Sequence, residues 1–172
     1  MRELVVDLDE IASAMDDGLR EFHDYYLDTH TGKLILLPEE LVARCDGDHA
    51  DEDDLDDWDR EQLAIAKAID AEAAAAGRRR YEWVPEHESH DAYALMVRFA
   101  ESVEDTHLRE LFAVALDGRG AFRRFRDVLY GYPAERERWF RLKNAEVHDR
   151  VTQWLRSLGI EPLPPDRPGA TK

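Results

Sequence analysis

The sequence predicts an α+β fold in which a small antiparallel β-sheet packs against a predominantly helical C-terminal half. The first observation behind this prediction is a pair of runs within residues 21–38 that are rich in aromatic and branched side chains and flank a turn sequence. The second is that apolar residues recur at spacings of three and four from about residue 90 onward, as in amphipathic helices. The chain has 172 residues, of which 44% are hydrophobic, which is enough for one domain with a buried core.

The N-terminal part is predicted to form a short helix followed by a hairpin. Residues 7–17 are expected to be helical, because Asp7 can cap the first turn and apolar side chains follow on one face. Strands are expected over residues 22–27 and 33–37. The segment between them ends in Gly32, which suits the left-handed position of a bulged turn.

The middle of the chain is predicted to contain an acidic loop, a helix and the third strand of the sheet. Residues 46–57 are expected to form the loop, since ten acidic residues and one basic residue lie between positions 46 and 61. A helix is expected over residues 55–76. A strand is expected over residues 81–84, and Pro85 ends it.

Four helices are predicted in the C-terminal half, separated by glycine, aspartate and proline residues. In the last helix Phe140 is expected to face inward, and its neighbour Trp139 is expected to pack against the preceding helix. The four expected helices cover residues 90–104, residues from Asp105 or Thr106 up to Asp117, residues 120–130, and residues 133–158.

These elements predict a single α+β domain over residues 1–160. Residues 161–172 contain four prolines and are expected to form a disordered tail.

The charge distribution limits the classes of partner. The formal net charge is −16, which opposes long-range attraction to nucleic acid and other polyanions. In contrast, nine basic and five acidic residues lie between positions 119 and 150. A local basic face can still bind an anion at short range, because salt screens charges beyond about 10 Å.

Other features predict a cytoplasmic protein. The single cysteine, Cys45, excludes an internal disulfide and a multi-cysteine zinc site. The N-terminus lacks the basic and apolar segments of a signal peptide, and no apolar run reaches the length of about 18 residues that crosses a membrane. We expect no membrane partner, and the oligomeric state stays open.

The most distinctive segment is a block of two glycines, two phenylalanines and four arginines within residues 118–127. On a helix that starts at Gly120, the two phenylalanines share one face and arginines line another. Guanidinium groups bind phosphates and carboxylates in bidentate pairs, and glycines permit a close backbone approach. The candidate binding residues, which include three cations of the last helix, are Gly118, Gly120, Arg119, Arg123, Arg124, Arg126, Arg136, Arg138 and Lys143.

Several interpretations of this block stay open. In one, the arginines pair internally with the protein's many carboxylates, and the glycines only separate two helices. In a second, the protein is a non-catalytic binding or regulatory module whose arginine-rich helix contacts an acidic protein partner. The same surface could instead contact a nucleic acid, although the net charge opposes this. A further alternative is an enzyme acting on a phosphorylated substrate, with His87, His90 or His107 beside the arginines. No catalytic residue is assigned.

No metal or cofactor site is expected. The segment Gly118-Arg119-Gly120 lacks the lysine of a P-loop and the third glycine of a dinucleotide-binding loop. The acidic run does not place its acids and glycine at the positions of a calcium-binding loop. His87 and His90 are three residues apart, whereas a zinc-binding helix needs a spacing of four.

A set of motifs extends over most of the chain. They are Tyr25-Tyr26-Leu27-Asp28 with Thr31-Gly32, Val84-Pro85, Asp91-x-Tyr93-x-x-Met96-x-x-Phe99, Gly118-x-Gly120-Ala121-Phe122-Arg123-Arg124-Phe125-Arg126-Asp127, Trp139-Phe140-x-x-Lys143 and Trp154-Leu155-x-x-x-Gly159-Ile160. Together they resemble a family of bacterial proteins catalogued as uncharacterised protein family 0158, over roughly residues 5–160. That family has no assigned activity, so the resemblance implies a fold and supplies no catalytic residues.

Overall fold

The chain forms two compact units, Met1–Glu86 with Val151–Lys172, and His87–Arg150. The computed structural model describes residues 1–45, 56–74, 79–87 and 89–165. Strands and helices are both present, which confirms the predicted α+β class. The prediction of one domain over residues 1–160 stays a prediction, and the two compact units are described separately below.

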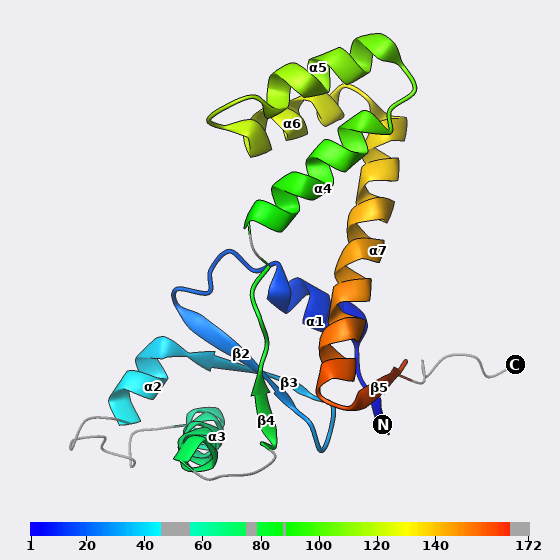
Figure 1. Cartoon of the computed structure of the whole chain (residues 1–172). Helices are drawn as coiled ribbons and strands as arrows, with labels where there is room; N and C mark the ends of the chain where they lie inside the picture. Colours follow the sequence, from blue (N-terminus) through cyan, green and yellow to red (C-terminus); the bar gives the residue numbers. More distant parts are fainter. Residues whose placement is uncertain (46–55, 75–78, 88, 166–172) are drawn as a thin grey trace, which may run out of the picture. The chain divides into compact units, whose positions relative to one another are not determined.

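The first unit contains the predicted three-stranded sheet (Figure 1). Its strands are β2 (His23–Asp28), β3 (Leu34–Pro38) and β4 (Tyr81–Trp83), all antiparallel, in the order β3-β2-β4. The Gly32 amide donates to the Asp28 carbonyl at 2.8 Å, and Gly32 has a φ of +77°. The hairpin and its turn are therefore as predicted, with boundaries that move by one residue.

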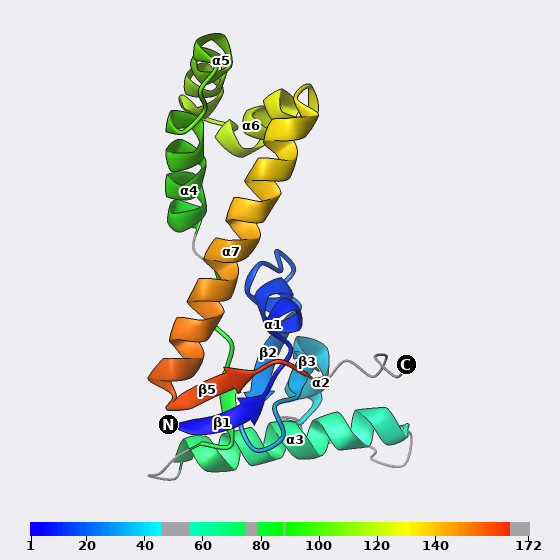
Figure 2. The ribbon, with the colours of Figure 1, turned by 90° about the vertical axis from the view of Figure 1, so that its right-hand side faces the viewer.

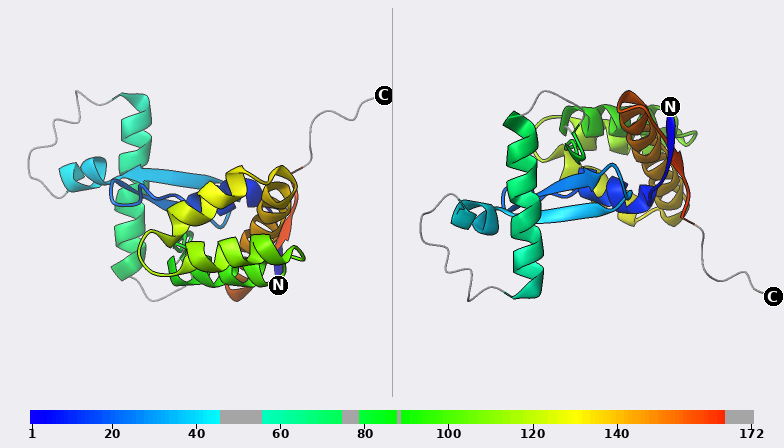
Figure 3. Two further views of the ribbon diagram at one scale, coloured as in Figure 1. Left: turned by 90° about the horizontal axis from the view of Figure 1, so that it is seen from above. Right: turned by 90° about the horizontal axis from the view of Figure 1, so that it is seen from below.

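Three helices accompany this sheet: α1 (Leu8–Met15), α2 (Glu39–Cys45) and α3 (Asp57–Ala74). Asp7 caps α1, because its carboxylate accepts the amides of Asp9 at 3.0 Å and Glu10 at 3.1 Å. Helix α2 was not predicted, since it is short and directly follows a strand. Helix α3 runs across the strands of the hairpin (Figure 3).

The first unit also contains a two-stranded parallel sheet that the sequence did not predict. It joins β1 (Arg2–Val5) to β5 (Ile160–Leu163), two segments from opposite ends of the chain (Figure 2). The predicted disordered tail is therefore wrong over residues 161–163. Pro162 is tolerated because a strand with one neighbour has a free edge, where the missing N–H breaks no ladder bond.

Two predicted segments lie mostly outside the described residues. They are the acidic loop predicted over residues 46–57, of which positions 46–55 lie outside, and the tail predicted over residues 161–172, of which positions 166–172 lie outside.

An ion pair between partly exposed Arg80 and buried Asp28 anchors the end of β2. The Arg80 guanidinium donates to the Asp28 carboxylate at 2.8 and 3.1 Å, and the His30 amide donates to it at 2.9 Å. Burial by itself would raise the pKa of Asp28. The hydrogen bonds from Arg80, the His30 amide and Thr31 outweigh it and hold the pKa well below the ordinary value.

The second unit consists of the four predicted helices, of which the last continues into the first unit. They are α4 (Ser89–Glu101), α5 (Thr106–Leu116), α6 (Ala121–Tyr130) and α7 (Pro133–Ser157). Asp105 caps α5, because its carboxylate accepts the Leu108 amide at 2.7 Å.

Four aromatic rings form the centre of the second unit's core. Phe125 lies 4.8 Å from Trp139, 5.0 Å from Phe112 and 5.9 Å from Phe99, measured between ring centroids. The prediction that Trp139 packs against the preceding helix is therefore confirmed. The prediction that Phe140 faces inward is wrong, since Phe140 is 53% exposed. Adjacent residues on a helix point about 100° apart, and Trp139 takes the inward position.

Among the described residues, no helix is long and apolar enough to cross a membrane.

Candidate binding site

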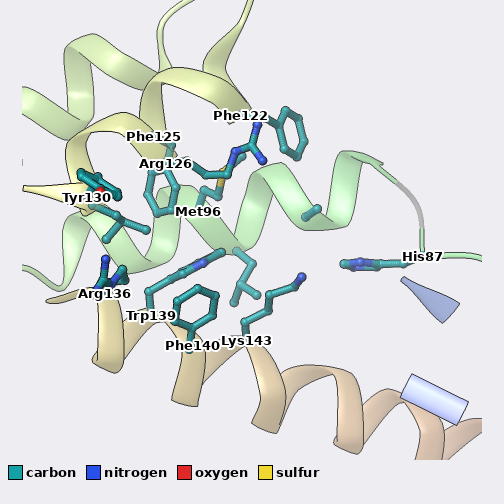
Figure 4. A pocket seen from close by; sticks show the side chains of 13 residues that line it. His87, Met96, Phe122, Phe125, Arg126, Tyr130, Arg136, Trp139, Phe140 and Lys143 are labelled. Atoms are coloured by element: carbon teal, nitrogen blue, oxygen red, sulfur yellow. The ribbon is translucent and has the colours of Figure 1, made fainter. Parts of the chain in front are cut away.

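Helices α4, α6 and α7 of the second unit surround a cavity of about 550 Å³ (Figure 4). It lies among residues of all three helices and is partly open to solvent. Its lining combines apolar, aromatic and cationic side chains: His87, Ala92, Leu95, Met96, Phe122, Phe125, Arg126, Leu129, Tyr130, Arg136, Trp139, Phe140 and Lys143.

Each helix contributes one stripe of side chains to the cavity. On α6 the stripe starts at Phe122 and continues with the residues three, four, seven and eight positions after it. On α7 it starts at Arg136 and continues with the residues three, four and seven positions after it. On α4 it starts at Ala92 and continues with the residues three and four positions after it. These spacings place each set on a single helical face.

The floor of the cavity belongs to the hydrophobic core. Leu95 and Met96 from α4, Phe125 and Leu129 from α6, and Trp139 from α7 are all buried. The floor is therefore rigidly packed, because its side chains also hold the unit together.

Three aromatic side chains at the cavity are exposed. Phe122 is 45% exposed, Phe140 53% and Tyr130 80%. The sequence predicts Phe122 and Phe125 on one helical face. Phe125 is buried, but Phe122 lies one turn before it, at the edge where the cavity opens.

Three cationic side chains complete the lining, Arg126, Arg136 and Lys143, and make it a cationic cavity. Figure 4 shows Arg136 beside Tyr130 at one end of the cavity, His87 at the opposite end, and Lys143 pointing inward from α7 between them. The Arg136 guanidinium lies 5.9 Å from the Tyr130 ring centroid, a cation–π contact. No carboxylate is among the described residues that line this cavity.

A sequence model of an uncharacterised protein family, UPF0158, matches residues 1–166. The chain belongs to the UPF0158 family. A relative in that family, the UPF0158 protein PA5073 of Pseudomonas aeruginosa, is 26% identical over 163 residues, which cover 94% of this chain and 88% of the relative. No solved structure matches the chain.

In this UPF0158 chain, Arg124 makes internal contacts rather than pointing into the cavity. Its Nε donates to the Ala115 carbonyl at 3.0 Å, and its two terminal nitrogens donate to the carbonyls of Asp117 and Arg119. These carbonyls lie at the end of α5 and in the turn before α6. Arg124 therefore supplies the hydrogen bonds that the last carbonyls of a helix otherwise lack.

Arg138 is also engaged inside the unit. It donates to Glu135 at 2.7 Å and to Ser102 at 2.9 Å, and its guanidinium lies 4.5 Å from the Phe99 ring centroid. The interpretation in which arginines of the block pair internally thus describes Arg124 and Arg138.

The two remaining arginines of the candidate set face solvent outside the cavity lining. The Arg119 side chain is exposed. The Arg123 side chain is 84% exposed and has the Asp127 carboxylate 3.9 Å away. A pair at this distance and exposure contributes little to stability.

Gly118 and Gly120 have a conformational role. Their φ angles are +74° and +77°, a region that side chains with a Cβ rarely adopt. A Cβ on Gly118 would meet nothing within 4 Å, and one on Gly120 would meet only the Arg124 guanidinium at 3.4 Å. These glycines are therefore explained by the turn between α5 and α6, without a close backbone approach to a ligand.

The sequence interpretation missed the α4 side of the cavity, namely Ala92, Leu95 and Met96. Their spacing of three and four was visible, but the same spacing also fits an ordinary core face. His87, an acid–base candidate on the sequence, lines the cavity. The His90 side chain is 89% exposed and is not in the lining.

A second polar cluster lies in the first unit, at the end of α1. The Asp17 carboxylate accepts the Leu19 amide at 2.9 Å, His23 at 2.7 Å and Tyr25 at 2.8 Å. Hydrogen bonds from Leu19, then His23 and Tyr25, lower the pKa of Asp17 to about 2. The cluster ties the loop after α1 to strand β2. Over the described part of the chain, no group of three metal-binding side chains comes together.

Replacing Arg124 with alanine is expected to lower the free energy of unfolding by about 1–3 kcal/mol, because three carbonyls lose a charged donor. The matched control is Arg123→Ala on the same helix, for which a change below about 0.5 kcal/mol is expected because the side chain is exposed. Urea unfolding followed by circular dichroism measures both. Equal effects of the two substitutions would contradict the capping role of Arg124.

Proposed function

We propose that this UPF0158 protein is a non-catalytic binding module whose cationic cavity contacts an acidic segment of a partner protein. The observation that carries the proposal is the combination of exposed aromatic side chains with cationic ones around an apolar cavity. Aromatic residues and arginine are enriched in protein interfaces, and they dominate the binding energy there.

The expected binding energies assign different roles to the aromatic and the cationic side chains. Covering about half of an aromatic side chain removes on the order of 100 Å² from water, which contributes about 2–3 kcal/mol. An exposed ion pair contributes at most about 1 kcal/mol. Phe122, Tyr130 and Phe140 would therefore supply most of the affinity, and the cations would select an acidic partner and speed its association.

The charge of the whole chain favours a protein over a nucleic acid. With a net charge of −16, the protein repels a polyanion at long range. A short acidic segment carries far less charge, and it can meet the local cations within a screening length of about 10 Å.

The enzyme alternative has one observation in its favour, the presence of His87 in the cavity lining beside cationic groups. The rest of the described lining is aliphatic, aromatic or basic. His87 is the lining residue that would have to supply the acid–base chemistry. The lining thus favours binding.

Site-specific cross-linking tests the proposal. A photo-reactive benzoylphenylalanine replaces Phe122 at the cavity edge, and in a control it replaces Val114, which is 73% exposed on α5 and outside the lining. The protein is irradiated in host lysate, and the adducts are mapped by mass spectrometry. We expect protein adducts at Phe122 that map to acidic segments, and none of these at Val114.

Three results would overturn the proposal: the same adducts at both positions, no protein adducts at Phe122, or adducts at Phe122 that consist of nucleic acid.

A further inference from the structure

We infer that the segment bound by the cationic cavity is an amphipathic α-helix that lies along α7, with two acidic residues two turns apart and large apolar residues between them. This inference rests on the proposed function and specifies the shape and sequence pattern of the partner.

The shape follows from the helices that form the cavity. Helices α4, α6 and α7 each present one stripe of side chains to the same space. Helices pack by inserting the ridges of one into the grooves of another. A fourth helix would therefore find three complementary helical faces, an arrangement like that of a helical bundle.

The chemistry of the lining also favours a helix over an extended segment. An extended peptide leaves its backbone N–H and C=O groups unpaired unless a strand edge or a polar wall accepts them. The described lining is mostly apolar, and most of it comes from the interiors of helices, where the backbone groups are already paired. An unpaired polar group in such a place costs about 1–3 kcal/mol. A helix satisfies its own backbone groups.

The pattern of the partner follows from the stripe on α7. Arg136 and Lys143 are seven residues apart. Between them, Trp139 and Phe140 lie three and four positions after Arg136. At 1.5 Å per residue the two cations are separated by about 10 Å along the axis of α7. A helix laid along α7 can match both cations with acidic residues seven positions apart, with apolar residues at the third and fourth positions between them.

Arg126 supplies the third cation and comes from α6, where Figure 4 shows its side chain near Met96 and Phe122. Arg126 and Phe122 are separated by one turn, so an apolar contact and an ionic contact alternate on this wall as well. The same amphipathic face of a partner would therefore contact α6 and α7.

Designed peptides test the inference on the full-length protein. The first probe is a fluorescent, stapled helix of about 15 residues, with glutamates seven positions apart and leucine and phenylalanine between them. A second probe has the same composition but glutamates four apart, and a third carries the apolar residues on the opposite face. We expect the first probe to bind at least about tenfold more tightly than the other two by fluorescence polarisation, with an affinity that falls as salt rises. Similar affinities for all three would overturn the inference.

Charge exchange provides the matched control. We expect the double variant Arg136→Glu/Lys143→Glu to bind the glutamate probe about tenfold or more weakly than the wild type does. The variant should instead bind more tightly a version of the probe that has lysines in place of the glutamates. The control is Arg123→Glu/Arg141→Glu, which makes the same change of charge at exposed positions outside the lining. It should alter neither preference. An equal effect of both double variants would show nonspecific attraction and overturn the inference.

The two proposals fail in different ways. If cross-linking at Phe122 recovers acidic protein segments but the three probes bind alike, the protein-binding function stands and the helical pattern is wrong. If cross-linking recovers no protein, the proposed function itself fails, whatever the probes do.

Discussion

Replacing Phe125 with alanine is expected to lower the free energy of unfolding of the second unit by about 3–5 kcal/mol. Phe125 is 1% exposed, and its ring contacts those of Phe99, Phe112 and Trp139. The substitution removes a large apolar side chain together with its edge-to-face contacts, and it leaves a cavity in the centre of the core. This is a large fraction of the stability of a small domain, which is about 5–15 kcal/mol.

The matched control is Phe122→Ala on the same helix, one turn earlier. Because Phe122 is 45% exposed, this substitution should cost less than about 1.5 kcal/mol. Urea unfolding followed by circular dichroism gives both values. On the proposed function, Phe122→Ala should instead weaken partner binding, so the two phenylalanines separate stability from binding. A loss of stability for Phe122→Ala as large as that for Phe125→Ala would contradict this assignment.

The second large effect is expected in the first unit, where Asp28→Asn should lower the free energy of unfolding by about 2–3 kcal/mol at neutral pH. The substitution removes the negative partner of Arg80 while the guanidinium stays in place, and hydrogen bonds to charged groups contribute about 1.5–3 kcal/mol. Solvent screening weakens the attraction between the two charges, since the Arg80 side chain is 41% exposed.

The same carboxylate makes stability depend on pH. The folded-state pKa of Asp28 lies below its ordinary value of 3.8, so its contribution is complete above the unfolded value. The contribution is lost as the pH falls from about 4 through the folded-state pKa. Unfolding free energies measured from pH 7 downward should fall less steeply for Asp28→Asn than for the wild type.

The control is Asp127→Asn, since the Asp127 side chain is 70% exposed and 3.9 Å from Arg123. It should leave the acid dependence unchanged. Some acid dependence should persist in Asp28→Asn, because the pKa of Asp17 is also lowered, to about 2. An acid dependence in Asp28→Asn that equals that of the wild type would contradict the role of the ion pair.

Local chemistry allowed most elements to be predicted from the sequence. The hairpin follows from the aromatic and branched runs and from Gly32, and the α1 cap follows from Asp7, because these signals act within a few residues. The helices α4 to α7 follow from apolar spacing over ten or more residues. The UPF0158 resemblance was also visible in the motifs, and the family match confirms it.

Contacts between distant parts of the chain could not be predicted in this way. The parallel pairing of β1 with β5 joins residues about 160 positions apart, and neither strand is long enough to show a strand pattern. The exposed position of Phe140 beside buried Trp139 depends on how α7 is rotated against α6. Periodicity gives a face of a helix, but it does not say which of two adjacent aromatic residues points at the neighbour.

For the candidate site, the sequence by itself determined which residue types are available: a basic, aromatic segment in an acidic chain, with glycines that begin a helix. Only the tertiary structure decided how the cations are used. Arg124 and Arg138 donate to carbonyls and side chains inside the second unit, and Arg126, Arg136 and Lys143 line an apolar cavity between three helices. The physical reason is that a guanidinium has the same chemistry in both places, and its partners are set by long-range packing rather than by neighbours in the sequence.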